Sequence, residues 1–217
     1  MLIRNYNTTF KRIEKTDLET LRYWRNSHDI NQFMEYREYI TPEMQLNWFN
    51  KINNISNFYF LIECNGANVG LINCKDINNN EKKFEVGIFI FENVNRNNII
   101  FPISSLVICE TIADFFKIET IETHILTTNI SFSKMLITLG YKLCESQERI
   151  LNQKYFIEKP DMLKTFQYLR THLVKVHGEQ KKTKIIFNNS DLVEIKDFFL
   201  NSYHRMPNSL KQKYSIN

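Results

Sequence analysis

The stretch FKIETIETHILTTNISFSKMLITLGY, residues 116–141, decides the fold of this 217-residue chain. Its first half carries β-branched and apolar residues over the length of one buried strand. Asn129 then stops the strand and can cap a helix in which apolar residues recur every three or four positions. Gly140 ends that helix as the residue after its last turn. The stretch therefore predicts a strand, a short amphipathic helix and a Gly-Tyr turn.

Capping and turn residues predict where the other helices and strands of residues 1–158 begin and end. Thr16-Asp17-Leu18-Glu19 fits a capping box that opens a first helix. Thr41 with Pro42 opens a second helix, as N-cap and first helical residue. Asn65-Gly66 predicts the turn of a β-hairpin. The complete expectation adds strands at 58–63, 69–74 and 84–91, a helix with Pro102 at its first position, and a closing hairpin at 141–146 and 153–158.

The last quarter of the chain differs in composition. Residues 1–159 carry 18 basic and 19 acidic side chains, whereas residues 160–217 carry 10 and 5. Two helices are predicted here, at 161–176 and after a capping box at 191–194. We expect one domain at 1–158 and a basic helical C-terminal extension at 159–217. Its apolar helix face must pack on the main domain, on a second copy or on a partner, which motivates the hypothesis of a homodimer.

Composition excludes several classes of protein. The chain is 43% hydrophobic, which is enough for a sizeable core. Its four cysteines are widely spaced, so we predict neither a disulfide framework nor a zinc site. The N-terminal stretch has no apolar segment typical of a signal peptide, and no run is long enough for a membrane span. These features predict a cytoplasmic protein without a metal.

The order strand, Asn, helix, Gly-Tyr resembles the C-terminal half of acetyl-CoA-dependent N-acetyltransferases of the GNAT superfamily, and residues 1–158 match that family's order of elements. The resemblance implies an α/β fold with a mixed central sheet flanked by helices. A second motif, YWRNSHDINQFM at 23–34, resembles the nucleotide-sugar N-acetyltransferases of pseudaminic acid biosynthesis. Those enzymes acetylate the 4-amino group of a UDP-linked amino-dideoxy sugar. The similarity covers residues 20–145.

The resemblance implies acetyl-CoA as the acyl donor. The donor needs free backbone groups on a strand and the N-terminus of a helix for its pyrophosphate. The family's glycine-rich loop is replaced here by an Asn-rich stretch, in which Asn can adopt left-handed backbone angles. The expected donor-binding residues are Phe89, Ile90, Phe91, Arg96, Asn97, Asn98, Ile99, Ile100, Phe101 and Asn129.

The acceptor and the chemistry are predicted from the same resemblance. An Arg fork and an Asn amide suit an anionic acceptor rich in hydroxyls. The expected acceptor-binding residues are Arg25, Asn26, Met34, Gln45 and Glu85. Glu85 is the predicted base, acting directly or through a water. Asn129 would orient the thioester or a water.

The family's general acid is a Tyr four residues before the Gly of the Gly-aromatic turn, and this chain has Leu136 there. Ser133 is the substitute that we predict, with solvent as the alternative.

Two other functions remain open from the sequence. One is a protein N-acetyltransferase of the ribosomal-protein type, which the residue at 136 favours and the motif at 23–34 disfavours. The other is a GNAT-fold binding module without catalysis, which the missing glycines favour. We expect small-molecule substrates and no nucleic-acid partner.

Overall fold

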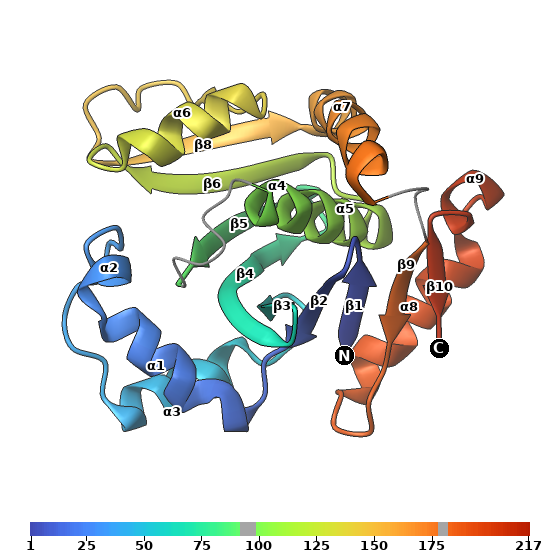
Figure 1. Cartoon of the computed structure of the whole chain (residues 1–217), viewed down its shortest axis with the longest axis horizontal. Helices are drawn as coiled ribbons and strands as arrows, with labels where there is room; N and C mark the ends of the chain where they lie inside the picture. Colours follow the sequence, from blue (N-terminus) through green and yellow to red (C-terminus); the bar gives the residue numbers. More distant parts are fainter. Residues whose placement is uncertain (92–98, 178–181) are drawn as a thin grey trace.

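The computed structural model describes residues 1–91, 99–177 and 182–217, and it contains one ten-stranded mixed sheet (Figure 1). The strand order is β10-β9-β1-β2-β3-β4-β5-β6-β8-β7. Two neighbouring pairs, β5 with β6 and β9 with β10, are parallel, and the other pairs are antiparallel. The predicted mixed sheet flanked by helices is confirmed.

From α1 to β8 the helices and strands follow the predicted order, with α2 as an additional short helix. The strands are β1 (Leu2–Asn5), β2 (Thr8–Arg12), β3 (Phe58–Cys64), β4 (Ala67–Asn78), β5 (Lys83–Ile90), β6 (Thr120–Leu126), β7 (Lys142–Leu143), β8 (Asn152–Glu158), β9 (Thr183–Ile186) and β10 (Tyr214–Ile216). The main helices are α1 (Leu18–Asn26), α2 (His28–Asn31), α3 (Pro42–Ile52), α4 (Ile100–Ser104), α5 (Glu110–Phe116), α6 (Ile130–Thr138), α7 (Lys159–His177), α8 (Val193–Arg205) and α9 (Asn208–Lys211). A π-helical turn at Ser105–Cys109 joins α4 to α5.

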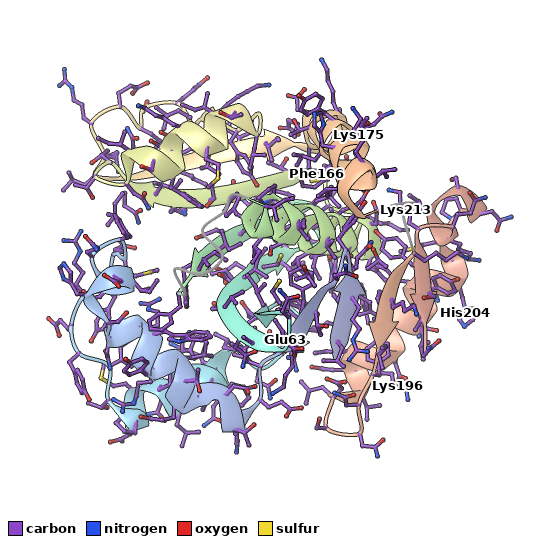
Figure 2. The ribbon with its side chains drawn as sticks, viewed as in Figure 1. Glu63, Phe166, Lys175, Lys196, His204 and Lys213 are labelled. Carbon is purple, nitrogen blue, oxygen red and sulfur yellow. The ribbon has the colours of Figure 1, made fainter. Side chains whose placement is uncertain are left out.

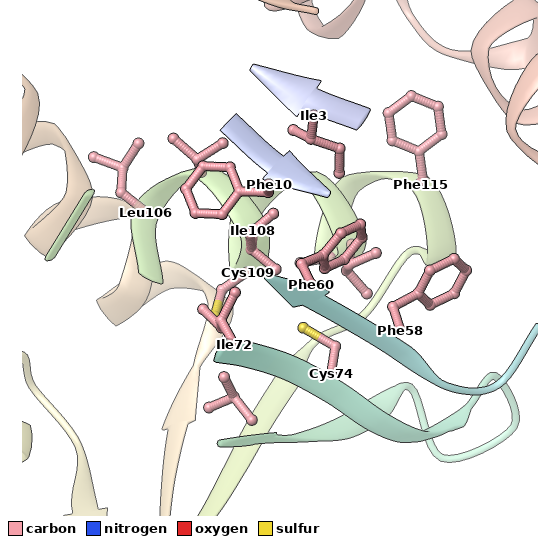
Figure 3. Packing of buried hydrophobic residues seen from close by; sticks show 14 of the residues in the cluster. Ile3, Phe10, Phe58, Phe60, Ile72, Cys74, Leu106, Ile108, Cys109 and Phe115 are labelled. Atoms are coloured by element: carbon pink, nitrogen blue, oxygen red, sulfur yellow. The ribbon is translucent and has the colours of Figure 1, made fainter. Parts of the chain in front are cut away.

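Each face of the sheet has its own core, because side chains of a strand alternate between the faces. Phe58, Phe60 and Ile62 of β3 pack with α5 in the larger core (Figure 3). Tyr59 and Leu61, between them in the chain, pack with α1 and α3. The central strands are therefore covered by helices on both faces.

Several local predictions are confirmed by the hydrogen bonds. The Thr41 hydroxyl accepts from the Met44 N–H at the start of α3. Asn129 caps α6 by accepting from the Phe132 N–H at 3.3 Å. Gly140 has a φ of +91° and ends α6, as a left-handed C-terminal residue should.

Other local predictions are wrong. Helix α1 begins at Leu18 after a 3₁₀ turn, and the reciprocal capping bonds join Glu14 and Asp17 instead of Thr16 and Glu19. Pro102 is the third residue of α4, not the first. The hairpin of β1 and β2 is missing from the sequence prediction. Its turn uses two non-glycine residues with positive φ, Tyr6 and Asn7, so the usual glycine signal is absent.

The C-terminal extension is more than a helical appendage. Its two predicted helices are α7 and α8, but β9 and β10 also extend the main sheet at the edge formed by β1. The apolar face of α8 enters the larger core, where the Phe199 ring lies 4.6 Å from the Phe115 ring. The face that motivated the homodimer hypothesis is thus covered by the same chain.

Buried ion pairs fasten this extension to α5. Glu110 pairs with Arg170 of α7 and with Lys213, whose Nζ lies 2.7 Å from the carboxylate (Lys213 is labelled in Figure 2). Asp114 pairs with Lys213 at 3.2 Å and accepts a hydrogen bond from the Tyr214 hydroxyl at 2.9 Å. Buried charges are stable only when paired, so these contacts fix the extension in place.

Within the part of the chain that the structure describes, no helix combines the length and the apolar character that crossing a bilayer requires.

Candidate active site

The sheet opens between β5 and β6. Their pairing covers only Lys83–Glu85 of β5 and Thr120–Glu122 of β6. Beyond that point β5 stays paired with β4, and β6 stays paired with β8. We call the point after Glu85 and Glu122 the fork. Figure 1 shows the two strands diverging from it.

The backbone of β5 beyond the fork has groups to offer a ligand. The Phe91 N–H donates to the Val69 carbonyl of β4. Because paired residues alternate along an antiparallel ladder, Phe89 is also committed to β4, and Ile88 and Ile90 direct their N–H and C=O toward the gap. Of the three residues predicted to present their backbone here, only Ile90 does so, and Ile88 was missed. The alternation along β5 decides which residues pair with β4 and which face the gap. The sequence alone does not reveal which of these two sets pairs with β4.

A small apolar cavity lies in the gap. Its walls come from β5, β6, the helical segment α4–α5, and α6 with its following turn, through Val86, Ile88, Phe101, Ser105, Thr123, Phe132, Leu136, Leu139 and Tyr141. The rings of Phe101 and Phe132 meet edge to face at 5.1 Å and connect α4 to α6. Burial raises the pKa of the Tyr141 phenol well above its usual value, with a further contribution from the neighbouring Cys109 and Cys74.

The predicted pyrophosphate site is only partly described. Arg96, Asn97 and Asn98 lie outside the described residues. Ile99 is the N-cap of α4, and Ile100 is buried as its first residue. Pro102 has no N–H, so the first turn of α4 offers the donors of Ile100 and Phe101 but none at the third position.

The side chains of Phe89 and Phe91 turn to the opposite face. The Phe91 ring stacks on Trp24 of α1 at 5.2 Å, and the Phe89 ring meets Trp24 edge to face at 6.2 Å. Trp24 is therefore a core residue that fixes α1 against β5. The next residue of α1 is Arg25, which lies near Tyr59 of β3.

Arg25 is a half-buried cation. Its Nε is buried and has no hydrogen-bond partner among the described residues. Burial lowers the pKa of the guanidinium, and the nearby Tyr59 acts in the opposite direction. Burial also raises the pKa of Tyr59 to about 12, with Asp76 and Glu85 contributing. A buried polar group without a partner calls for a ligand or a water.

The other predicted acceptor residues have mixed environments. Asn26 donates to the Ile40 carbonyl at 2.9 Å and accepts from the Ile40 N–H at 2.8 Å. Both ends of its amide therefore tie the segment after α2 to α1. Met34 lies half-buried in that segment. Gln45 is 5% exposed on the sheet-facing side of α3, and its amide forms no hydrogen bond with another described residue.

Glu85 lies at the fork with both carboxylate oxygens occupied. Its Oε1 is 2.9 Å from the Lys75 Nζ, and its Oε2 is 3.2 Å from the His124 Nδ1. Lys75 is the register partner of Glu85 on β4. His124 was missed because it lies 39 positions away and shares a face with Glu85 only through the pairing of β5 and β6.

Asn129 and Ser133 both bond to their own helix. Asn129 is the N-cap of α6, and the Ser133 hydroxyl donates to the Ile130 carbonyl at 2.9 Å. Neither is among the residues that line the cavity. Leu136 does line it, at the position where the family has its Tyr. The catalytic roles of Asn129 and Ser133 stay predictions.

Comparison with known proteins fits this geometry. Residues 7–142 match the model of a family described as the acetyltransferase (GNAT) domain. The chain belongs to the GNAT acetyltransferases. Members of this family use acetyl-CoA, so this chain is an acetyl-CoA-dependent N-acetyltransferase of the GNAT type. No protein among the curated sequences matches it.

Solved structures share the GNAT fold with this chain. Apo FdhC, described as a nucleotide-linked sugar GNAT, is 20% identical with a TM-score of 0.64, over 78% of this chain and 97% of that one. Spermidine N-acetyltransferase from Vibrio cholerae, in complex with CoA and spermine, is 17% identical with a TM-score of 0.60, over 73% and 99%. Campylobacter jejuni N-acetyltransferase PseH is 16% identical with a TM-score of 0.52, over 72% and 96%. At these identities the likeness establishes the fold and leaves the acceptor open.

The gap beyond the fork suits acetyl-CoA. It offers backbone groups at Ile88 and Ile90 that pair with no described strand on this side, an apolar cavity beside them and the start of α4. The thioester is the group that bound acetyl-CoA supplies to the reaction.

Proposed function

We propose that this GNAT enzyme acetylates the amine of an anionic acceptor, a nucleotide-linked amino-deoxy sugar used in surface glycan biosynthesis. The observation that supports this acceptor is Arg25. No carboxylate of the described residues forms an ion pair with it, and its Nε lacks a hydrogen-bond partner among those residues. A phosphate would supply two acceptors in the planar geometry that a guanidinium binds best.

The same face is poorly suited to a polyamine. Its two central carboxylates, Glu85 and Glu122, are each paired with a lysine, at 2.9 Å from Lys75 and 2.8 Å from Lys154. A polycation would have to displace these lysines and would also meet the charge of Arg25. Like charges near a binding site disfavour such an acceptor by Coulomb repulsion.

The proposed roles follow the geometry. Ile88 and Ile90 would hold the donor through their backbone, and a free N–H among them would stabilise the negative charge that develops on the thioester oxygen. Arg25 would bind the acceptor's phosphate, with Gln45 and Met34 beside the sugar. Glu85 would promote loss of the amine proton at the fork, either directly or through a group that it holds, and solvent would protonate the leaving thiolate.

A direct assay tests the acceptor. Thiol release from acetyl-CoA is measured with a UDP-linked 4-amino-4,6-dideoxy sugar, with spermidine and with an amine-bearing peptide. We expect the highest kcat/KM with the sugar nucleotide. A preference for spermidine or the peptide would contradict the proposed acceptor, and the peptide result would favour the ribosomal-protein type. No thiol release and no acetyl-CoA binding would favour a binding module.

The role of Arg25 is tested by Arg25→Met, which keeps the aliphatic packing and removes the charge. A lost charged hydrogen bond is worth about 1.5–3 kcal/mol, so kcat/KM for the sugar nucleotide should fall roughly tenfold to hundredfold, mainly through KM. Arg22→Met is the matched control one turn earlier on α1, because Arg22 already pairs with Glu19. An equal loss in both variants would indicate a general disturbance of α1.

A further inference from the structure

His124 lies at the fork on the same face of the sheet as Glu85, where we expect the acceptor to bind. It is the second residue of β6 beyond the last pair with β5, and its side chain is 34% exposed. Thr123, the preceding residue, lines the cavity on the opposite face. Adjacent residues of one strand therefore place a cavity wall on one side and an imidazole on the other.

The imidazole is held by a carboxylate. Its Nδ1 lies 3.2 Å from the Glu85 Oε2, and the other Glu85 oxygen is held by Lys75. In a neutral ring, an Nδ1–H that donates to Glu85 leaves the lone pair on Nε2. The Nε2 forms no hydrogen bond with another described residue. This arrangement of carboxylate, ring and free nitrogen is that of an oriented general base.

The charged side chains around the imidazole form ion pairs with one another. They come from Lys75 on β4, Lys83 and Glu85 on β5, Glu122 on β6 and Lys154 on β8, which is the register partner of His124. Tyr59 on β3 stays neutral because burial raises the pKa of its phenol to about 12. Each carboxylate of this group has a lysine partner. The His124 Nε2 is thus a proton acceptor at the fork, and no described side chain forms a hydrogen bond with it.

We propose that His124 is the general base of the acetyl transfer and that Glu85 positions it. The inference rests on the proposed N-acetyltransferase function but not on the identity of the acceptor. The amine nitrogen forms a bond to the thioester carbon while the carbon–sulfur bond breaks. The amine proton passes to the His124 Nε2, and the leaving thiolate takes a proton from solvent, to which the imidazolium later returns its own.

The test compares kcat, KM and pH profiles of wild type, His124→Gln and Glu85→Gln with whichever acceptor of the panel is acetylated. Loss of a general base costs about 10²- to 10⁴-fold in rate. We expect a fall of this size in kcat for His124→Gln, with little change in KM for acetyl-CoA. Any decrease in kcat at low pH that comes from a protonated general base should disappear in this variant, whereas a decrease that comes from protonation of the acceptor amine should remain. Glu85→Gln should lower kcat less and keep the decrease.

Control variants separate a chemical role from a structural one. His204→Gln changes an exposed histidine of α8 in the C-terminal extension (Figure 2) and should leave both kcat and the pH profile unchanged. His124→Asn is a second variant for the case that His124→Gln fails to fold. Loss of the low-pH decrease in Glu85→Gln but not in His124→Gln would overturn the inference and make Glu85 the direct base.

The outcomes also separate this inference from the proposed function. Wild-type activity on spermidine or a peptide alone would contradict the proposed acceptor and still test His124. Full activity of His124→Gln on the sugar nucleotide would overturn the role of His124 and leave the acceptor standing. No acetylation of any amine by wild type would overturn both.

Discussion

At the fork, one face of the sheet is apolar and enclosed, whereas the opposite face is charged and partly open to solvent. The enclosed face is the cavity between β5, β6 and α6, with Leu136 and Phe132 among its walls. The open face carries Glu85 and His124, held by Lys75. One pair of diverging strands supplies both environments because successive side chains point to opposite faces. The comparison teaches that a single gap between two strands offers an apolar environment on one side and a charged one on the other, as the proposed donor site and the proposed proton transfer require.

The largest effect should come from placing a charge on the enclosed face. Leu136 is 3% exposed, and Leu136→Asp would lose its packing and bury an unpaired carboxylate. Together these changes should cost on the order of 5 kcal/mol in free energy of unfolding and abolish acetyl-CoA binding. Urea denaturation and calorimetry measure both effects. Ile137→Asp, at the next position and 61% exposed, is the matched control and should change little.

A second charged cluster tests whether charge alone marks the active face. Asp114 is buried against Lys213 and Tyr214, far along α5 from the cavity residues. Asp114→Ala leaves the buried Tyr214 hydroxyl without its acceptor, while Lys213 keeps Glu110, and should cost about 2–3 kcal/mol in stability. We expect kcat of the folded protein to stay unchanged at low temperature. A fall in kcat without loss of stability would show that this cluster, too, contributes to catalysis.

The burial of Tyr59 on the open face can be tested through the pH dependence of the free energy of unfolding. Its pKa of about 12 in the folded state exceeds the value of about 10 in an unfolded chain. Between these values the folded protein binds more protons, so the free energy of unfolding should fall as pH rises from 10 to 12. Urea denaturation across this range should show a weaker fall for Tyr59→Phe, by about 2 kcal/mol at pH 12. Equal slopes for both proteins would mean that Tyr59 is not shielded from solvent.

The smallest effect concerns Asn129, which the sequence predicts as both a cap and a catalytic residue. Asn129→Ala should cost about 1 kcal/mol in stability through loss of the N-cap bond to Phe132. Asn129→Ser can still accept that bond and should restore the stability. If kcat falls in Asn129→Ser while its thermal unfolding matches wild type, Asn129 has a role beyond capping.

The sequence by itself determined the elements that local rules govern. Thr41 with Pro42, Asn129 and Gly140 each mark a helix end, and the structure confirms all three. The order of elements also resembles that of the GNAT family, to which the chain belongs. Local rules failed at the hairpin of β1 and β2, whose turn has positive φ at Tyr6 and Asn7 without a glycine.

Only the tertiary structure decided which residues meet. His124 contacts Glu85 because β5 and β6 run parallel in a fixed register. The backbone of Ile88 faces the gap because the Phe91 N–H donates a hydrogen bond to the Val69 carbonyl, which fixes the alternation along β5. Strands β9 and β10 join the sheet because β1 leaves an edge that β9 can pair with. These contacts depend on the pairing of strands that are far apart in the sequence. A one-residue shift in register would turn the same side chains to the opposite face of the sheet. The resemblance of the sequence to known enzymes therefore predicts a GNAT enzyme, and strand pairing brings together the residues that we propose for proton transfer.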